Sequence, residues 1–393
     1  VEKAVMGSRS TLIVLTPEWV QSEWNAFQEL LASTADPSGV QRKLLPVMLR
    51  ACTPPPRIAM RDIADLTDPD ERDEQLQRLM RSLKRSQSKG SRLTDAGGET
   101  QLPLPSELAP ASKTDDLPEY DVTKQPWYIQ SLPPLQRVTQ AEAKPWFGNM
   151  PVLLLTVNEN EFFAVGRLLQ PLPEQNRILQ VAFGNETYYL GRYGTYNTVL
   201  TKTQMGSVGL GATMLATQHA QDIWKPKATI AVGVAFGMNR QKQQIGDVLI
   251  AKEIIPYNPI RAGATIIERG QRLASDAGLF NRFEHTYDWR FERPDGPLCR
   301  LHKGTIISGE ELVDSAERNA TLLQRFPEAI GGEMEGTGLS AASFYDRRPW
   351  ILIKAICDWA DGAKHGKHQP LAAAAAASLV HHVLSDPDAL HNI

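Results

Sequence analysis

Hydrophobic residues occur along this chain in short strand-like runs that alternate with helical patterns. The first run, 10–16, predicts a buried strand, and Pro17 then opens a pattern of apolar residues at helical spacing. A second apolar run at 43–49 predicts another strand, in which Pro46 favours an edge position or a bulge. Apolar residues on one face of 68–83 predict a charged amphipathic helix. This alternation indicates an α/β unit at the N-terminus.

Longer apolar runs in the C-terminal half predict a larger α/β domain. Runs typical of buried strands lie at 151–157, 188–200, 228–232, 248–255, 304–307 and 351–357. Helical patterns begin at 162, after the glycines at 206, 209 and 211, at 336 and at 371. The strand 228–232 is expected to end where the Gly-rich turn 233–237 begins. The alternation predicts a central mixed sheet with helices on both faces.

A stretch rich in Pro, Ser and Gly over 86–148 separates these two regions and is typical of a linker. We therefore expect a domain over 1–85, this linker, and a second domain over 149–388. An aromatic cluster in a free linker would be unusual. Three linker residues are thus expected to dock on a neighbouring domain: Trp127, Tyr128 and Ile129.

Composition places the chain among ordinary globular proteins. Hydrophobic residues make up 42% of the 393 residues, and the net charge of -3 gives no electrostatic footprint for nucleic acid. No apolar run is long enough to cross a membrane, and no signal peptide is visible. The widely spaced Cys52, Cys299 and Cys357 form neither a zinc pattern nor a disulfide framework, which predicts a reducing, cytoplasmic location. Val1 in place of Met leaves a processed, truncated or renumbered start open.

Carboxylates stand at the ends of several predicted strands. The apolar run before the last helix stops at Asp358, and Glu161 and Glu335 also follow strands. Ligands bind beyond the carboxyl ends of strands in open α/β sheets, although a lone Asp there serves equally well as a helix cap. Three carboxylates with two Gly-rich turns predict a pocket for a polar, hydroxyl-rich ligand. His365 and His368 are expected in a mobile loop over the site rather than as a metal pair, and no cofactor is expected.

Three motifs occur together in the N-terminal region. They are the strand with its flanks at 8–17, the box Ser22-Glu23-Trp24, and the strand 45–49. Together they resemble the C-terminal half of a Toll/interleukin-1 receptor (TIR) domain. The resemblance implies a partial, flavodoxin-like parallel sheet whose first strand and first helix would precede Val1. Many TIR domains cleave the nicotinamide–ribose bond of NAD, using a glutamate a few residues after the tryptophan.

Gln28 stands where the resemblance places that catalytic glutamate. A neutral amide neither takes a proton nor stabilises a developing positive charge. Glu29 lies about 100° further around a helix and would act only in a shifted register. The alternatives are a shifted site, an inactive TIR module, or an engineered Glu→Gln change, and we favour the inactive module. The TIR site would then consist of Gln28, Trp24 and Ser22.

A longer series of motifs runs through the C-terminal region. It comprises Thr156 with Glu161, the Gly-rich turn 233–237, 246–248, Ser308-Gly309, 333–336 and 354–361. In this order the motifs resemble the nucleoside phosphorylase and nucleosidase superfamily. They are most similar to its methylthioadenosine/adenosylhomocysteine nucleosidase branch, in the version that is fused to immune effectors. The resemblance covers about 149–386 and implies an α/β/α domain that cleaves a purine N-glycosidic bond.

The resemblance also assigns roles to residues. Asp358 is the acid for purine N7, and Glu161 orients or deprotonates the attacking water. Glu335 accepts from the ribose hydroxyls, and Met334 packs on the sugar. These roles suit a transition state with oxocarbenium character, which needs a protonated base and a positioned water. Lys354 replaces an arginine of the nucleosidases and is expected to hold the water or a glutamate. The other expected substrate contacts are Glu333, Gly233, Ala235, Leu312 and Val313.

Two departures from the phosphorylase pattern favour water as the acceptor. Ala231-Val232 precede the central turn where phosphorylases carry an arginine, and the loop 157–159 lacks their Gly-Asp pair. Hydrolysis is therefore expected. Six basic residues in long loops are equally candidates for a 5′-phosphate site and for solvated surface: Arg240, Lys242, Arg261, Arg290, Arg293 and Arg300. If some of them line the pocket, the substrate is a nucleotide such as ATP.

Two functions of different class stay open from the sequence. In the first, the C-terminal domain hydrolyses the N-glycosidic bond of an adenine nucleoside or nucleotide, within an antiphage-type effector. In the second, that domain senses a nucleotide and controls a TIR NAD hydrolase. A weaker third reading makes the TIR half an assembly scaffold. The expected partners are a small-molecule nucleoside or nucleotide and further copies of the chain, with neither nucleic acid nor membrane.

Overall fold

The computed structural model divides into two compact units, Val1–Ala111 and Ser112–Ile393, which we describe separately. The structure describes residues 11–17, 44–52, 58, 63–68, 72, 75, 77 and 117–393, with gaps at 129, 210, 259, 263–265, 269, 345 and 363–365. The predicted TIR site of Ser22, Trp24 and Gln28 lies outside the described residues, as do Glu29, Ile129, His365 and most of the helix predicted over 68–83.

A parallel sheet forms the described part of the first unit. Its strands lie in the order β1-β2-β3, with β1 at Thr11–Leu15, β2 at Leu44–Met48 and β3 at Ala64–Asp65. Both strands predicted from the sequence are thereby confirmed. The prediction that Pro46 marks an edge or a bulge is wrong, because β2 is the central strand and pairs with β1 without a register shift. The proline is accommodated because β3 is short and pairs only with Val47 and Met48.

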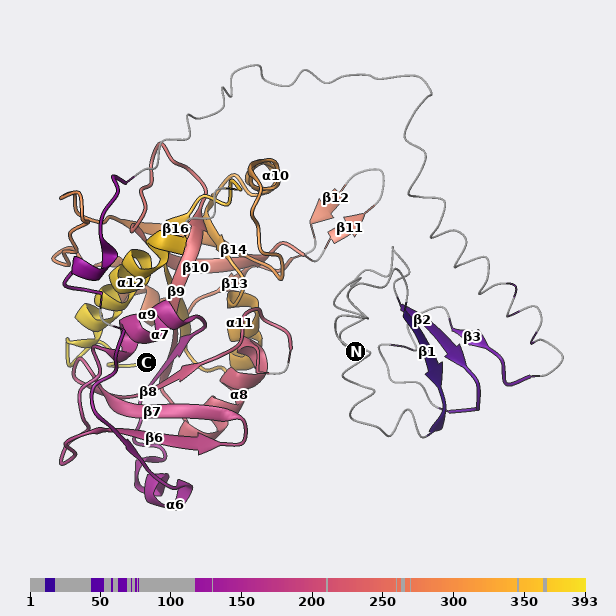
Figure 1. Cartoon of the computed structure of the whole chain (residues 1–393), viewed down its shortest axis with the longest axis horizontal. Coiled ribbons are helices and arrows are strands. Elements are labelled where there is room, and N and C mark those ends of the chain that lie inside the picture. The colour runs from indigo at the N-terminus through magenta and orange to yellow at the C-terminus, as the bar shows by residue number, and fades with distance from the viewer. Residues whose placement is uncertain are drawn as a thin grey trace. The chain divides into compact units, whose positions relative to one another are not determined.

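An 11-stranded sheet organises the described part of the second unit (Figure 1). Its order is β13-β10-β14-β15-β9-β5-β8-β7-β6-β4, and β16 pairs with both β10 and β9. The strands are β4 (Leu135–Arg137), β5 (Val152–Thr156), β6 (Ile178–Phe183), β7 (Glu186–Tyr193), β8 (Tyr196–Lys202), β9 (Ala228–Gly237), β10 (Val248–Pro256), β13 (Leu273–Ala274), β14 (Leu301–Ser308), β15 (Ala329–Glu333) and β16 (Trp350–Asp358). A separate hairpin joins β11 (Ile260–Ala262) to β12 (Ile266–Glu268).

Five of these strands close into a ring, because β16 bridges β10 and β9 while β14 and β15 connect the same two strands on the other side. Pairing around the ring is mixed: β9 runs parallel to β5 and β16 and antiparallel to β15. The mixed sheet predicted from the sequence is confirmed. Strand β9 meets three partners in all, so residues from β5, β15 and β16 converge around it.

Helices cover both faces of this sheet, as predicted (Figure 1). They are α6 (Gln140–Ala143), α7 (Glu159–Gly166), α8 (Thr213–Trp224), α9 (Ala277–Glu284), α10 (Ala316–Arg325), α11 (Gly336–Phe344) and α12 (Gln369–Leu384), with the short 3-10 helices η1 (Val122–Lys124), η2 (Lys144–Trp146) and η3 (Gly366–His368). One core cluster joins α7, α9 and α12 to the sheet, and another joins α8 and α11 to its other face. The buried alanines 372–377 let α12 approach β9 and β16 closely.

The structure differs from the sequence prediction in two places. Strand β9 continues through 233–237, which was predicted as a turn, because β16 pairs with it as far as Phe236 and β15 pairs with Phe236 and Gly237. Part of the stretch predicted as a linker belongs to the second unit: β4 pairs with β6, and Trp127 is buried against Phe291. The predicted docking of Trp127 is thereby confirmed.

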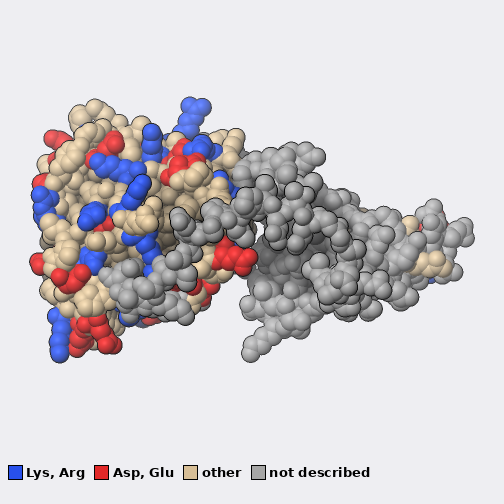
Figure 2. Space-filling model, turned by 90° about the horizontal axis from the view of Figure 1, so that it is seen from above, with Lys and Arg blue, Asp and Glu red and all other residues tan. Residues whose placement is uncertain are grey.

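Charge is mixed on the exposed surface. On the face seen in Figure 2, Lys and Arg side chains of the second unit are interspersed with Asp and Glu. This distribution agrees with the small net charge of -3. Among the described residues, none of the helices combines the length and apolar character that a membrane span requires.

Candidate functional site

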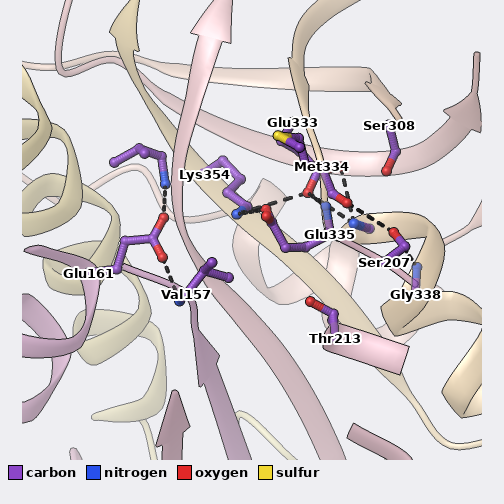
Figure 3. Close-up of polar contacts among 12 residues, drawn as sticks. Val157, Glu161, Ser207, Thr213, Ser308, Glu333, Met334, Glu335, Gly338 and Lys354 are labelled. Carbon is purple, nitrogen blue, oxygen red and sulfur yellow. Dashed lines mark hydrogen bonds and ion pairs between the residues drawn. The ribbon is translucent and has the colours of Figure 1, made fainter. Parts of the chain in front are cut away.

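Three chain segments bring charged side chains together around β9. The β5–α7 junction supplies Glu161, the β15–α11 junction supplies Glu333 and Glu335, and β16 supplies Lys354 and Asp358. Each segment is next to β9 because β5, β15 and β16 are its three paired neighbours. Figure 3 shows Glu161 and the Glu335–Lys354 pair facing the same space. The sheet topology thus explains why residues far apart in the sequence lie beside the same strand.

Glu161 is buried and held by backbone donors. Its Oε2 accepts from the amides of Val157 (2.7 Å) and Asn158 (3.1 Å), and its Oε1 accepts from Val234 N (2.8 Å). The side-chain Oδ1 of Asn158 accepts in turn from Glu161 N, so the two residues form the capping box of α7. Burial raises the pKa of Glu161, although the charge of Lys354 opposes the shift.

Gly233 permits the close approach of two charged groups. A Cβ at this position would lie 2.2 Å from Glu161 Oε1 and 2.9 Å from Lys354 Nζ. Because those distances are shorter than real contacts, any other residue would displace one or both side chains. The Gly-rich sequence is therefore needed here for space and not for turning the chain, since β9 stays extended.

Lys354 is a fully buried cation among carboxylates. Its Nζ lies 2.9 Å from Glu335 Oε2 and 3.9 Å from Glu333 Oε2. Burial acts to lower the pKa of Lys354, but the charges of Glu335, Glu161 and Glu333 outweigh it and hold the pKa above the usual lysine range. The lysine therefore stays charged and is already paired.

The two glutamates beside Lys354 differ in protonation. Burial raises the pKa of Glu333 to about 7, with Lys354 opposing and Glu335 reinforcing the shift. Burial also acts on Glu335, but its ion pair with Lys354 outweighs that effect and lowers its pKa. Glu333 accepts from the amides of Glu335 (2.8 Å) and Gly336 (2.9 Å), so it also caps α11. The ion pair with Lys354 thus favours the ionised form of Glu335, whereas burial favours the protonated form of Glu333.

The sequence prediction missed two residues that support Glu335 and Met334. Ser207 Oγ donates to Met334 O and accepts from Gly338 N, both at 2.9 Å (Figure 3). Glu310 in turn accepts from Ser207 N at 3.0 Å. The available signals were the position of Ser207 within the Gly-rich loop before α8 and that of Glu310 directly after Ser308-Gly309.

Asp358 lies at the end of β16, beside a register shift between Ile356 and Asp358. Its Oδ1 accepts from Ala360 N (3.0 Å), and its Oδ2 accepts from the thiol of Cys357 (3.1 Å). Burial raises the pKa of Asp358, and Asp314 and Asp361 add to the increase. The helix-cap alternative is wrong, because the next helical element among the described residues begins only at Gly366.

The remaining predicted contacts occupy different environments. Ala235 is buried in β9, and Val313 is buried in a cluster with Tyr257 and Ala360. Leu312 is 58% exposed. Met334 is partly buried, and its carbonyl is the group fixed by Ser207.

The basic residues considered for a 5′-phosphate site separate into two groups. Arg293 is 4% exposed and is held by Asp295 and Gln244, and Arg290 donates to the carbonyls of its neighbours Tyr287 and Trp289, so both are structural. Arg240 lies closer to the acid: it pairs with Asp361 and stacks 5.2 Å over the ring of Trp359. The others are Lys242, which is exposed, Arg300, and Arg261, whose side chain is not described.

The sequence predicted that His365 and His368 do not form a metal pair. His368 is buried and stacks on Tyr120, with ring centroids 6.1 Å apart, which places it in a packing role. Within 117–393, less the gaps given above, His, Cys, Asp and Glu form no cluster suited to a metal ion. His365 falls in one of those gaps.

Two family models match the chain. Residues 152–385 match the model of the phosphorylase superfamily, and residues 1–80 match that of the TIR domain. The chain therefore belongs to the phosphorylase superfamily and carries a TIR domain match at its N-terminus. Both families that the sequence motifs resemble are confirmed.

The curated relatives are nucleosidases. A death domain-containing ATP nucleosidase of Amphimedon queenslandica is 31% identical over 265 residues, which are 61% of this chain and 49% of that protein. A 5′-methylthioadenosine/S-adenosylhomocysteine nucleosidase of Staphylococcus epidermidis is 25% identical over 193 residues, 48% of this chain and 79% of that enzyme. The chain thus spans about half the length of the ATP nucleosidase that it matches.

Solved structures share the fold of the second unit. Two of them are methylthioadenosine/adenosylhomocysteine nucleosidases. The one from Neisseria meningitidis aligns with a TM-score of 0.50 at 22% identity, and the one from S. pneumoniae with a TM-score of 0.51 at 18% identity. Each alignment covers 60% of this chain, and 98% and 99% of the respective structures. The α/β fold predicted for the C-terminal domain is confirmed.

Proposed function

We propose that the C-terminal domain hydrolyses the N-glycosidic bond of an adenine nucleoside or nucleotide, releasing adenine. The observation that carries the proposal is the grouping of Glu161, Glu335 and Lys354 around Gly233, with Asp358 further along the same strand as Lys354. This reaction needs a general base for the attacking water, a group that binds the sugar, and an acid that protonates the leaving purine. The named activities of the nucleosidase relatives support the same class of substrate.

Glu161 is the proposed base for the attacking water. Three backbone amides fix its carboxylate, two on Oε2 and one on Oε1. A carboxylate oxygen has room for about two hydrogen bonds, so Oε1 keeps one position for a water molecule. The water would lose its proton to Glu161 as its oxygen bonds to the anomeric carbon. Burial, which raises the pKa of Glu161, strengthens it as a base.

Glu335 is the proposed acceptor for the ribose hydroxyls, with Lys354 holding its carboxylate in place. Three carboxylates, Glu161, Glu333 and Glu335, surround one lysine, so the pocket is acidic. An acidic, water-poor pocket favours the positive charge that develops on the sugar as the bond to the base breaks. Because Lys354 is already paired with Glu335, it is not free to bind phosphate, which supports water over phosphate as the acceptor.

Asp358 is the proposed acid, which passes a proton to purine N7 so that adenine leaves as a neutral base. Along β16 it lies four residues beyond Lys354, or about 13 Å of extended chain. The base would therefore bind nearer the carboxyl end of β16, and the sugar nearer Lys354. Burial raises the pKa of the Asp358 carboxyl, so it stays protonated to a higher pH than an ordinary aspartate. A general acid needs this property.

Adenine release from a series of substrates tests this proposal. The protein would be incubated with ATP, AMP, adenosine, methylthioadenosine and NAD, and free adenine or nicotinamide would be quantified. Adenine from one or more adenine nucleosides or nucleotides is expected without added phosphate, and D358N should abolish it. Unchanged release by D358N would refute the site, and a strict requirement for phosphate would replace hydrolysis by phosphorolysis.

The N-terminal unit enters this proposal as an assembly module. Gln28 occupies the position of the TIR glutamate, which favours the C-terminal domain as the active one. The proposed setting is an antiphage-type effector in the cytoplasm that works as a homo-oligomer and depletes an adenine nucleotide such as ATP. The second candidate, a nucleotide sensor controlling a TIR NAD hydrolase, predicts nicotinamide release from NAD in the same assay.

A further inference from the structure

We propose that Cys357 is a positioning residue for the acid Asp358, and that its thiol leaves the transferable proton on Asp358 Oδ2. This inference rests on the proposed function, in which Asp358 protonates the base. It concerns a residue that lies next to the acid in sequence and has no part in binding the sugar or the water.

The two oxygens of Asp358 have donors of unequal strength. Oδ1 accepts from the backbone amide of Ala360 at 3.0 Å, and Oδ2 accepts from the thiol of Cys357 at 3.1 Å. Ala360 has a positive φ of 51°, so the turn presents its amide back toward the carboxyl group. A backbone N–H is a strong donor and a thiol is a weak one. The oxygen held by the amide therefore carries more negative charge, and the proton is left on the other.

This asymmetry fits the proton transfer required of Asp358. With the proton on Oδ2, that oxygen donates to N7 of a bound purine. Oδ1, fixed by Ala360, stays an acceptor and suits the exocyclic amine of adenine. A hydroxyl in place of the thiol would stabilise the ionised carboxylate more strongly and make Asp358 a weaker acid catalyst at a given alkaline pH.

Two neighbouring carboxylates act on the pKa of Asp358. Asp314 and Asp361 raise its pKa by repulsion, and Arg240 is held by Asp361. The thiol itself stays protonated, because burial and the charge of Asp358 raise the pKa of Cys357 well above the ordinary cysteine value. Cys357 therefore acts as a hydrogen-bond donor throughout the range in which Asp358 titrates.

The alkaline limb of the pH profile of kcat/KM tests this role. The limb reports the pKa of the acid in the free enzyme. We expect its midpoint to move up in C357A, which loses the donor, and down in C357S, which has a stronger one. Each shift should be on the order of half a pH unit, the effect of one weak hydrogen bond. The same midpoint in all three proteins, or the reverse order, would overturn the proposal.

Two controls separate this role from packing and from the proposed function. C299A removes another buried cysteine, so it should cost stability without moving the limb. If C357A does not fold, the comparison of C357S with the unsubstituted protein decides the question alone. An inactive D358N together with an unmoved limb overturns only the thiol's role. A fully active D358N overturns both the acid assignment and the inference built on it.

Discussion

At the scale of single residues, function depends on how closely charged groups approach one another. Glu161 and Lys354 both lie in the space that a side chain at residue 233 would need. Each charge also shifts the pKa of the other, in addition to the larger effect of burial on both. Two predictions follow from this crowding, one on geometry and one on proton affinity.

Gly233→Ala should lower kcat/KM about 100-fold, because a displacement of roughly 1 Å at the reacting groups costs that much. The added Cβ would overlap Glu161 Oε1, so the base must move. Steady-state adenine release measures the effect. Gly304→Ala is the matched control, since its Cβ would lie 3.2 Å from Ile330 Cγ2 on a strand position outside the pocket. Equal losses in both variants would contradict the steric explanation.

The acid limb of the pH profile should belong to Glu161 and lie above the ordinary glutamate range. A base works only when ionised, so activity falls as the pH drops through its pKa, and burial has raised that pKa. E161Q should lose activity at all pH values, by roughly 100-fold to 10,000-fold, as expected for a missing general base. A normal acid limb in E161Q would exclude this assignment.

At the scale of secondary structure, helix and strand ends place the chemistry. The capping box of α7 uses the side chain of Glu161, so one residue both caps the helix and is the proposed base. Glu333 likewise caps α11 while it lies beside Lys354. Strand β9 joins these ends because it pairs with β5, β15 and β16. We therefore expect helix capping and the proposed catalysis to be coupled.

Asn158→Ala should weaken both the capping of α7 and the release of adenine. Loss of the N-cap is expected to cost about 1 kcal/mol of unfolding free energy, and the freed backbone should let Glu161 move, so kcat should fall further than stability explains. Thermal unfolding and adenine release measure the two effects. Asp276→Ala removes the cap of α9, away from the pocket, and should cost stability alone. Comparable activity losses in both variants would contradict the coupling.

At the scale of the whole molecule, the chain consists of two units, and the second one extends into the stretch predicted as a linker. Leu117 and Trp127 are buried in it, and Tyr120 stacks on His368, which ends the loop that follows the proposed acid. This segment therefore contributes to the core beside the site.

Deleting residues 1–111 should leave a folded C-terminal unit that still releases adenine. Deleting residues 1–130 should also remove Leu117 and Trp127 from the core. Each lost side chain should lower the free energy of unfolding by ~2–3 kcal/mol, so both Tm and activity should fall. Differential scanning calorimetry and the adenine assay compare the two proteins. Equal Tm values would show that the segment does not stabilise the core, and an inactive 112–393 protein would show that the first unit is needed for catalysis.

Local pattern and motif order predicted much of this protein. Apolar runs located β1, β2, β5, β10 and β16, because a buried strand needs continuous apolar side chains. Motif spacing indicated both families and drew attention to Asp358, Glu161, Glu335 and Lys354. The short strand β4 was missed because two of its three residues are polar and exposed, and β6 was missed because Gln180 interrupts its apolar run.

By itself the sequence determined the fold class, the families and which residue types stand at strand ends, because these depend on neighbours along the chain. Only the tertiary structure decided that Gly233 makes space for Glu161 and Lys354, and that Ser207 contacts both Met334 and Glu310. These contacts join segments whose separation in sequence carries no information about distance. The contacts at Gly233 exist because β9 pairs with β5 and β16, and burial in that arrangement also shifts the pKa values on which the proposed chemistry depends.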